Sequence, residues 1–132
     1  MDTTRTILLV DDNFMNRRLV AAMLNDKPYR LVEKESGRDG LEYLLAHQEA
    51  VDLVLLDIGL PDLNGTEVCR ALREKGGSGR RLPIIAYTAR AMADERRSIL
   101  AAGFDDILTK PITREDFTFI LERYLGDARH PS

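Results

Sequence analysis

Short apolar runs alternate along the chain with segments whose apolar residues recur at helical spacing. The apolar runs predict strands at residues 6–10, 29–35, 53–56, 83–87 and around 107–108. The intervening segments predict helices at 13–25, where Met15, Leu19, Ala22 and Met23 form a stripe, and at 37–47, 66–74 and 91–102. A fifth helix follows from the spacing of Phe117, Ile120, Leu121, Tyr124 and Leu125. Alternation of strands and helices at these lengths predicts βαβ units and a parallel sheet.

Charged residues separate the central strands from the edge strands. The first, third and fourth strands are almost continuously apolar, as expected where helices cover both faces of a sheet. The second carries Arg30, Glu33 and Lys34, and the fifth begins beside Asp105 and Asp106, a composition typical of sheet edges. With right-handed crossovers, this favours the strand order 2-1-3-4-5 of a flavodoxin-like, doubly wound α/β fold with five helices. We expect one domain at residues 6–125, with tails at 1–5 and 126–132.

Composition excludes several classes of function. The 132 residues suit one domain, and a net charge of −3 argues against a nucleic-acid-binding protein. The single cysteine, Cys69, cannot form an internal disulfide or a CxxC metal site. The longest strictly apolar run, residues 19–24, is too short to cross a membrane, and no secretory signal opens the chain. We therefore expect a soluble, cytoplasmic domain that binds neither nucleic acid nor membrane.

Candidate chemistry lies where the predicted strands end. The first strand runs into Asp11 and Asp12, the third into Asp57, the fourth into Thr88 and the fifth into Lys110. Because ligands of open α/β sheets bind beyond the carboxyl ends of the strands, we expect these side chains to converge. Clustered carboxylates suit Mg²⁺ or Mn²⁺, and a carboxylate beside a metal, an ammonium and a hydroxyl suits phosphoryl transfer through an acyl phosphate. A single aspartate at a strand end is usually a turn or cap residue, but coincidence at four strand ends is improbable.

These residues fall in motifs that together resemble the receiver domain of two-component response regulators over residues 6–125. The resemblance is carried by Val10-Asp11-Asp12-Asn13, Leu55-Leu56-Asp57-Ile58 with Pro61 and Gly65, Tyr87-Thr88-Ala89, and Thr109-Lys110-Pro111. It implies that Asp57 accepts the phosphoryl group. It also implies that Asp11 and Asp12, directly or through water, hold Mg²⁺ together with Asp57 and the Gly59 backbone carbonyl. It also implies that Thr88 and Lys110 bind the phosphoryl oxygens and that the Lys110–Pro111 peptide is cis.

The sequence departs from the family pattern at the residues that modulate the switch. Many receivers carry an aromatic residue three positions before the lysine, whereas this chain has Ile107. The implied aromatic movement on phosphorylation is therefore in question. Gly59 and Arg90 occupy positions that vary within the family, and the lifetime of the phosphorylated state varies with them.

The resemblance implies a phosphoryl acceptor with slow autophosphatase activity rather than a turnover enzyme. Its donor would be a histidine kinase or histidine phosphotransfer protein, and its output would be protein–protein contacts. The domain could be a stand-alone regulator or part of a hybrid histidine kinase or longer regulator. An aspartate-nucleophile phosphatase and a nucleotide- or flavin-binding module are less favoured, because their motifs are missing. Arg17 and Arg18 lie beside the acidic residues and belong either to a donor-docking surface or to a solvated helix face.

Overall fold

The computed structural model describes residues 4–75, 82–89 and 92–126. Within them, strands and helices alternate as the sequence predicted. The strands are β1 (Arg5–Val10), β2 (Tyr29–Lys34), β3 (Leu53–Asp57), β4 (Ile84–Thr88) and β5 (Asp106–Thr109). The helices are α1 (Phe14–Leu24), α2 (Gly37–Ala46), α3 (Gly65–Lys75), α4 (Ala93–Ala101) and α5 (Arg114–Leu121), with short helical turns at Gln48–Ala50 and Glu122–Gly126.

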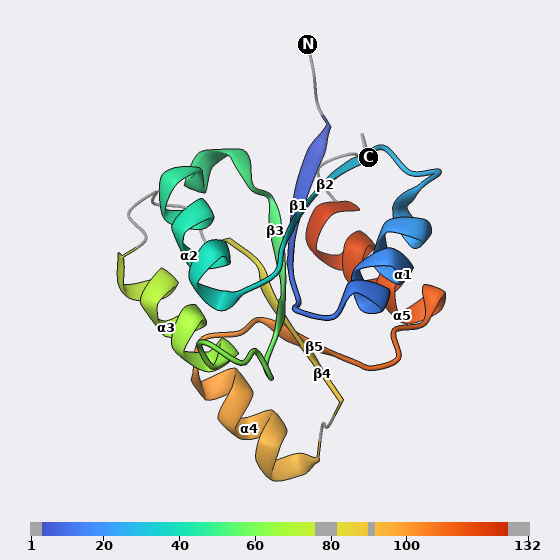
Figure 1. The fold of residues 1–132 in the computed structure, drawn as a ribbon. Coiled ribbons are helices and arrows are strands. Elements are labelled where there is room, and N and C mark those ends of the chain that lie inside the picture. Colours follow the sequence, from blue (N-terminus) through green and yellow to red (C-terminus); the bar gives the residue numbers. More distant parts are fainter. Residues whose placement is uncertain (1–3, 76–81, 90–91, 127–132) are drawn as a thin grey trace.

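The strands form one parallel sheet in the order β2-β1-β3-β4-β5, which confirms the predicted topology. The charged strands β2 and β5 lie at its two edges, and the apolar strands β1, β3 and β4 lie inside. Helices α1 and α5 cover one face of the sheet, while α2, α3 and α4 cover the other (Figure 1). Because all strands are parallel, their carboxyl ends lie together at one end of the sheet, called the carboxyl edge below, and their amino ends lie at the other, called the amino edge.

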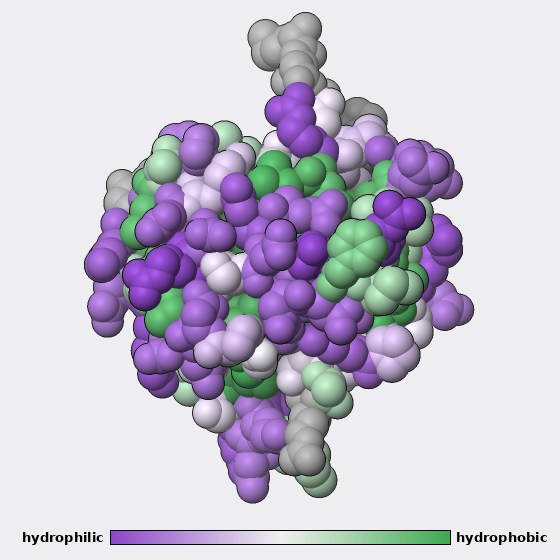
Figure 2. Space-filling model, in the orientation of Figure 1, coloured by the Kyte–Doolittle hydropathy of each residue, from purple (hydrophilic) through white to green (hydrophobic). Residues whose placement is uncertain are grey.

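Two hydrophobic clusters fill the spaces between the sheet and its helix layers. Alternate residues of each inner strand enter opposite clusters, as Leu8 and Leu9 of β1 do. Hydrophilic side chains cover most of the face seen in Figure 2, and hydrophobic ones form smaller, scattered areas. Among the described residues, none of the helices has both the length and the apolar character needed to span a bilayer.

Helix α1 buries Met23 of the stripe that the spacing indicated, but Met15, Leu19 and Ala22 of that stripe are exposed. Met15 and Leu19 are 70% and 37% exposed, whereas Val20, Met23 and Leu24 are buried. Arg17 completes the buried face of this helix. Both stripes have helical spacing, so periodicity alone could not identify the buried one in a helix that carries apolar residues all around.

The elements at the two ends of the described fold each extend one residue beyond the expected domain limits. Strand β1 begins at Arg5, one residue inside the predicted tail, and the turn Glu122–Gly126 includes the first residue of the predicted C-terminal tail. The predicted start of the fourth helix at Ala91 lies outside the described residues, and α4 is seen from Ala93. The limits of the domain at residues 6 and 125 therefore stay a prediction.

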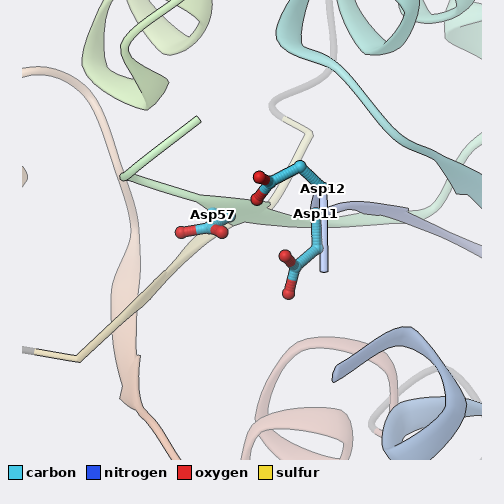
Figure 3. Close-up of side chains that lie close together, drawn as sticks. All are labelled: Asp11, Asp12 and Asp57. Carbon is cyan, nitrogen blue, oxygen red and sulfur yellow. The ribbon is translucent and has the colours of Figure 1, made fainter. Parts of the chain in front are cut away.

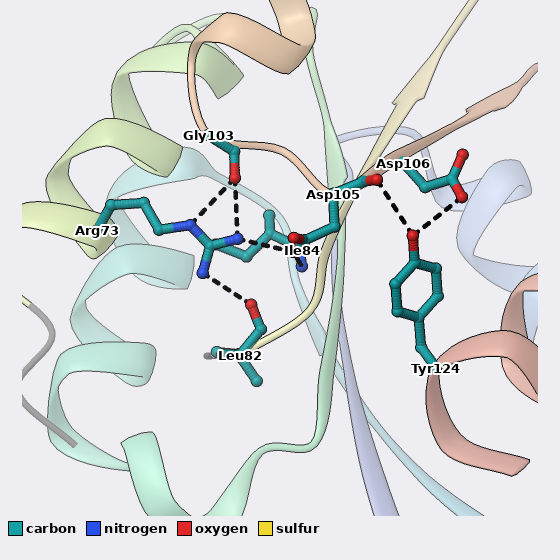
Figure 4. A network of polar contacts seen from close by, with 7 residues as sticks. All are labelled: Arg73, Leu82, Ile84, Gly103, Asp105, Asp106 and Tyr124. Atoms are coloured by element: carbon teal, nitrogen blue, oxygen red, sulfur yellow. Dashed lines mark hydrogen bonds and ion pairs between the residues drawn. The ribbon is translucent and has the colours of Figure 1, made fainter. Parts of the chain in front are cut away.

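A polar network ties elements together at the amino edge of the sheet, opposite the strand ends described below (Figure 4). The Arg73 guanidinium donates to the carbonyls of Leu82 and Gly103 and pairs with the Asp105 carboxylate at 2.7 Å. The same carboxylate accepts the Ile84 N–H, at the start of β4. One arginine from α3 thus holds the entry to β4 and the segment that connects α4 to β5.

Tyr124 extends these contacts from the other face of the sheet. Its hydroxyl donates to the backbone carbonyl of Asp105 and contacts the Asp106 carboxylate at 3.0 Å (Figure 4). Burial, followed by the Asp106 carboxylate, raises the pKa of Tyr124 to about 12. The phenol therefore remains a neutral hydrogen-bond donor at physiological pH.

Candidate functional site

Three carboxylates meet at the carboxyl edge of the sheet. Asp11 and Asp12 directly follow β1, and Asp57 is the last residue of the neighbouring strand β3 (Figure 3). One oxygen from each group lies within 4.8 Å of one from each of the others. Asp11 and Asp57 are 0% and 4% exposed, whereas Asp12 is exposed to solvent. The structure therefore brings together the three carboxylates expected from the sequence.

The Asp57 carboxylate contacts one ammonium group and accepts one backbone hydrogen bond. The Lys110 ammonium contacts Asp57 Oδ2 at 3.0 Å, and the Gly59 N–H donates to Asp57 Oδ1 at 3.0 Å. The Lys110 side chain is 22% exposed and its Nζ lies 4.9 Å from the centre of the Tyr87 ring. Lys110 thus compensates part of the negative charge of the cluster from within a partly desolvated position.

Asp11 is the most constrained of the three carboxylates. Its Oδ1 accepts the Asn13 N–H at 2.9 Å, but its buried Oδ2 has no hydrogen-bond donor among the described residues. Burial, reinforced by the neighbouring Asp57 carboxylate, raises the pKa of Asp11, against the opposing effects of the Asn13 N–H and Lys110. A buried oxygen without a donor is costly, and a cation that it could ligate would remove this cost.

The other residues expected at the site come from β4, β5 and the segment after β5, and one of them lies outside the described residues. Thr88 ends β4, and its carbonyl accepts the Lys110 N–H at 2.8 Å. The Lys110–Pro111 peptide is cis. Ile107 is 8% exposed and packs in the cluster between the sheet and α2, α3 and α4. Arg90 lies outside the described residues.

Local sequence features shape the loops that carry the carboxylates. Asn13 caps α1 by accepting the Asn16 N–H, so that the chain turns immediately after Asp12. Gly65 begins α3, where a Cβ atom would lie 2.6 Å from the Asp57 carbonyl oxygen. Only glycine permits this approach, and the Gly65 N–H donates to the Ile58 carbonyl to close the loop.

Sequence reasoning did not predict that two residues at this end of the sheet are buried. Arg17 was expected on a docking or solvated surface, but it is 8% exposed and donates to the Asp11 carbonyl. Its neighbour Arg18 is exposed, as expected. Tyr87 is fully buried below Lys110, and burial together with Asp11 and Asp57 raises its pKa to about 12. The position of Tyr87 directly before Thr88 on an apolar strand was the available signal.

The arrangement provides a nucleophile together with charges of opposite sign. Asp57 offers a carboxylate oxygen at an edge that solvent and ligands can reach through the exposed Asp12 and Gly59. Lys110 supplies a cation, and the Asp11 oxygen that lacks a donor within the described part of the chain supplies a ligand for a second one. Such a site can bind an oxyanion next to a carboxylate nucleophile.

Comparison with known proteins places the chain in a family. The model for the response regulator receiver domain matches residues 7–122. The chain is 40% identical over 129 residues to the sensor protein GacS of Pseudomonas syringae pv. syringae, covering 96% of this chain and 14% of that protein. It is 34% identical over 125 residues to the polar-differentiation response regulator DivK of Brucella ovis, covering 95% of this chain and 99% of that protein.

A solved structure agrees in fold and in sequence. The receiver domain of a sensor histidine kinase from Pseudomonas aeruginosa PAO1, which has a magnesium ion coordinated in its active-site cleft, superposes with a TM-score of 0.82. It is 36% identical, and the match covers 94% of this chain and 99% of that one. The match to the family model over nearly the whole chain, the sheet order and these relatives lead to one conclusion: the chain belongs to the response regulator receiver domain family.

Proposed function

We propose that Asp57 is the phosphoryl acceptor of this receiver domain. The observation that carries the proposal is the buried Asp57 carboxylate, bound by Lys110 at 3.0 Å beside two further carboxylates. An Asp57 oxygen attacks the phosphorus of a phosphohistidine, the P–N bond breaks, and the imidazole leaves with the bonding electron pair. The product is an acyl phosphate on Asp57.

The donor set fits a Mg²⁺ ion. All three side chains offer hard oxygen ligands, and the buried Asp11 Oδ2 has no donor among the described residues. Asp11, Asp12 and Asp57 would hold the ion, with the Gly59 carbonyl as a further ligand. When bound, the ion neutralises charge on the phosphoryl oxygens. Mn²⁺ is expected to substitute, because it takes the same oxygen ligands.

Lys110 and Thr88 have separate roles in this proposal. Lys110 pairs with Asp57 before phosphorylation and with a phosphoryl oxygen afterwards, since the ammonium is already within contact distance of the acceptor. Thr88, at the end of β4, donates its hydroxyl to another phosphoryl oxygen. Movement of Thr88 toward that oxygen would carry the segment that leads into α4 and so alter the surface of the domain.

The proposed phosphodonor is a histidine kinase or a histidine phosphotransfer protein. A receiver domain in complex with such a protein is known for Ssk1 and Ypd1 of Saccharomyces cerevisiae, a structure that shares the fold of this chain. The chain spans 14% of GacS but 99% of DivK, so both a hybrid-kinase and a stand-alone context are consistent with the proposal. In this proposal Asp57 accepts the phosphoryl group and the resulting acyl phosphate hydrolyses slowly. The domain acts in the cytoplasm, and its downstream partner is a protein.

Intact mass after incubation with acetyl phosphate and Mg²⁺ tests the acceptor. The wild type should gain one phosphoryl group, Asp57→Asn should gain none, and Asp26→Asn, which removes an exposed carboxylate elsewhere, should behave as the wild type. Full labelling of Asp57→Asn would refute the assignment. Release of phosphate without an adduct would instead favour a phosphatase, and no reaction would favour a binding module.

A further inference from the structure

Arg17 of α1 is buried against the acidic site although it carries a full charge. Its side chain is 9% exposed, its Nη1 donates to the Asp11 carbonyl at 2.8 Å, and its Nε contacts Glu33 Oε1 at 3.2 Å. The Phe14 ring lies 5.7 Å from the guanidinium carbon. Because burying a guanidinium is costly, these contacts indicate that the fold depends on its placement there.

The contacts connect three elements around one peptide bond. Arg17 belongs to α1, Glu33 belongs to β2, and the accepting carbonyl belongs to the residue that follows β1. The peptide unit that contains the Asp11 carbonyl is planar and ends at the Asp12 Cα atom. A hydrogen bond to that carbonyl therefore fixes the direction in which the chain leaves Asp11 and the point from which the Asp12 side chain starts.

We infer that Arg17, anchored by Glu33, is a positioning residue that holds Asp11 and Asp12 in the arrangement that binds the cation. The two carboxylates repel each other and Asp57, so without a restraint the loop after β1 would relax away from the cluster. Arg17 supplies that restraint on one side, and the Asp11 N–H, which donates to the Lys34 carbonyl at 3.1 Å, supplies it on the other. This inference depends on the metal site proposed above.

Electrostatics and positioning predict opposite effects of removing Arg17. Loss of a positive charge beside an acidic cluster would strengthen cation binding if charge were all that mattered. Loss of a restraint on two ligands would weaken it, by about 10- to 100-fold where a residue that orients metal ligands is removed. The sign of the change in Mg²⁺ affinity therefore distinguishes the two roles.

Arg18 provides a matched control. It is exposed on the same helix, carries the same charge and lies at a similar distance from the Phe14 ring, 5.9 Å, but no contact with the Asp11 carbonyl is seen for it. Arg18→Met therefore removes the charge and one ring contact without removing the restraint. Arg17→Lys retains the charge and lacks the forked guanidinium that contacts Asp11 and Glu33 together.

The experiment is Mg²⁺ titration of the full chain by calorimetry, with amide spectra of each metal-free variant to verify folding. We expect Arg17→Met and Arg17→Lys to weaken Mg²⁺ binding by about tenfold or more, with shifted Asp12 and Asn13 amide signals, and Arg18→Met to stay within about twofold of the wild type. Unchanged or tighter binding in folded Arg17→Lys would overturn the inference. If Arg17→Met does not fold, Arg17→Lys decides alone. Mg²⁺ binding by Asp11→Asn equal to that of the wild type would instead overturn the metal site itself.

Discussion

Mg²⁺ should stabilise the native state through the carboxylate cluster. Asp11, Asp12 and Asp57 contribute three negative charges and Lys110 one positive charge, which leaves a formal charge of −2 at one edge of the sheet. The unfolded chain disperses these carboxylates and therefore binds the ion weakly. Binding to the native state alone raises the free energy of unfolding as the free ion concentration exceeds the dissociation constant.

The expected rise in melting temperature follows from the length of the chain, which sets its entropy of unfolding. Above the dissociation constant, each tenfold increase in free Mg²⁺ adds about 1.4 kcal/mol to the free energy of unfolding. An unfolding entropy of about 2.1 cal/mol/K per residue gives roughly 0.28 kcal/mol/K for 132 residues. The melting temperature should therefore rise by about 5 °C per tenfold increase in Mg²⁺. This slope does not depend on the value of the dissociation constant.

Thermal unfolding followed by circular dichroism at constant ionic strength measures the slope. Asp11→Asn should lose most of it, whereas Asp26→Asn, an exposed carboxylate on the loop after α1, should retain it. Equal slopes in the wild type and Asp11→Asn would refute a metal site that includes Asp11. A wild-type slope of zero would refute the cluster as a Mg²⁺ site altogether.

Without Mg²⁺, the difference in stability between the wild type and Asp11→Asn should depend on pH with a defined sign. Burial and the Asp57 charge raise the pKa of Asp11 in the folded state above its value in the unfolded chain. Stability from this group is therefore complete below the unfolded pKa and is lost as pH rises through the folded pKa. At neutral pH and without Mg²⁺, Asp11→Asn should melt above the wild type, and this difference should shrink on acidification. A wild type that melts above Asp11→Asn at neutral pH would contradict the sign.

Three further predictions concern phosphorylation and its consequences. Lys110→Ala should retain most of the Mg²⁺ slope in thermal unfolding but lose phosphorylation-dependent changes in amide spectra, because the ammonium contacts only one Asp57 oxygen, Oδ2, and is not itself a ligand of the proposed cation; loss of the slope would contradict this. Gly59→Leu and Arg90→Ala should each alter the half-life of phospho-Asp57 measured by intact mass, Gly59→Leu lengthening it, since a Cβ at Gly59 would lie 3.9 Å from Asp57 Oδ1 with room to extend. With the beryllofluoride mimic, amide shifts should concentrate at Thr88 and in the segment before α4, with the Ile107 rotamer unchanged, because a buried β-branched side chain has few alternatives; a rotamer change at Ile107 would show that this position still takes part.

The fold and the carboxylate cluster followed from features that sequence displays directly. Apolar continuity identified the central strands, and parallel strands must end at a common edge, so Asp11 and Asp57 could be placed together. The buried face of α1 could not be assigned in this way. Arg17 occupies that face because its guanidinium satisfies a carbonyl at the end of β1, and a charged residue on a helix otherwise predicts a solvated position.

The pattern of apolar and charged positions along the chain also does not identify which side chains from distant segments pair with each other. The Lys110 contact with Asp57 followed from strand order, but the Glu33 contact with Arg17 joins a charged edge strand to a helix. The charges of β2 predict only an edge strand that resists pairing with another chain. One of them has a specific partner, and nothing in its spacing along the chain distinguishes it from its neighbours.

The Arg73 network at the amino edge has a consequence for how the domain opens. It holds the entry of β4 and the segment before β5, whereas the opposite end of the sheet carries repelling carboxylates and a buried oxygen that no donor of the described residues reaches. Amide protons near Ile84 should therefore exchange with deuterium only in near-global unfolding, while those near Asp12 exchange through cheaper local openings. The domain would then be rigid at the amino end of the sheet, where Arg73 holds it, and more mobile at the carboxyl end, where Asp57 would accept the phosphoryl group.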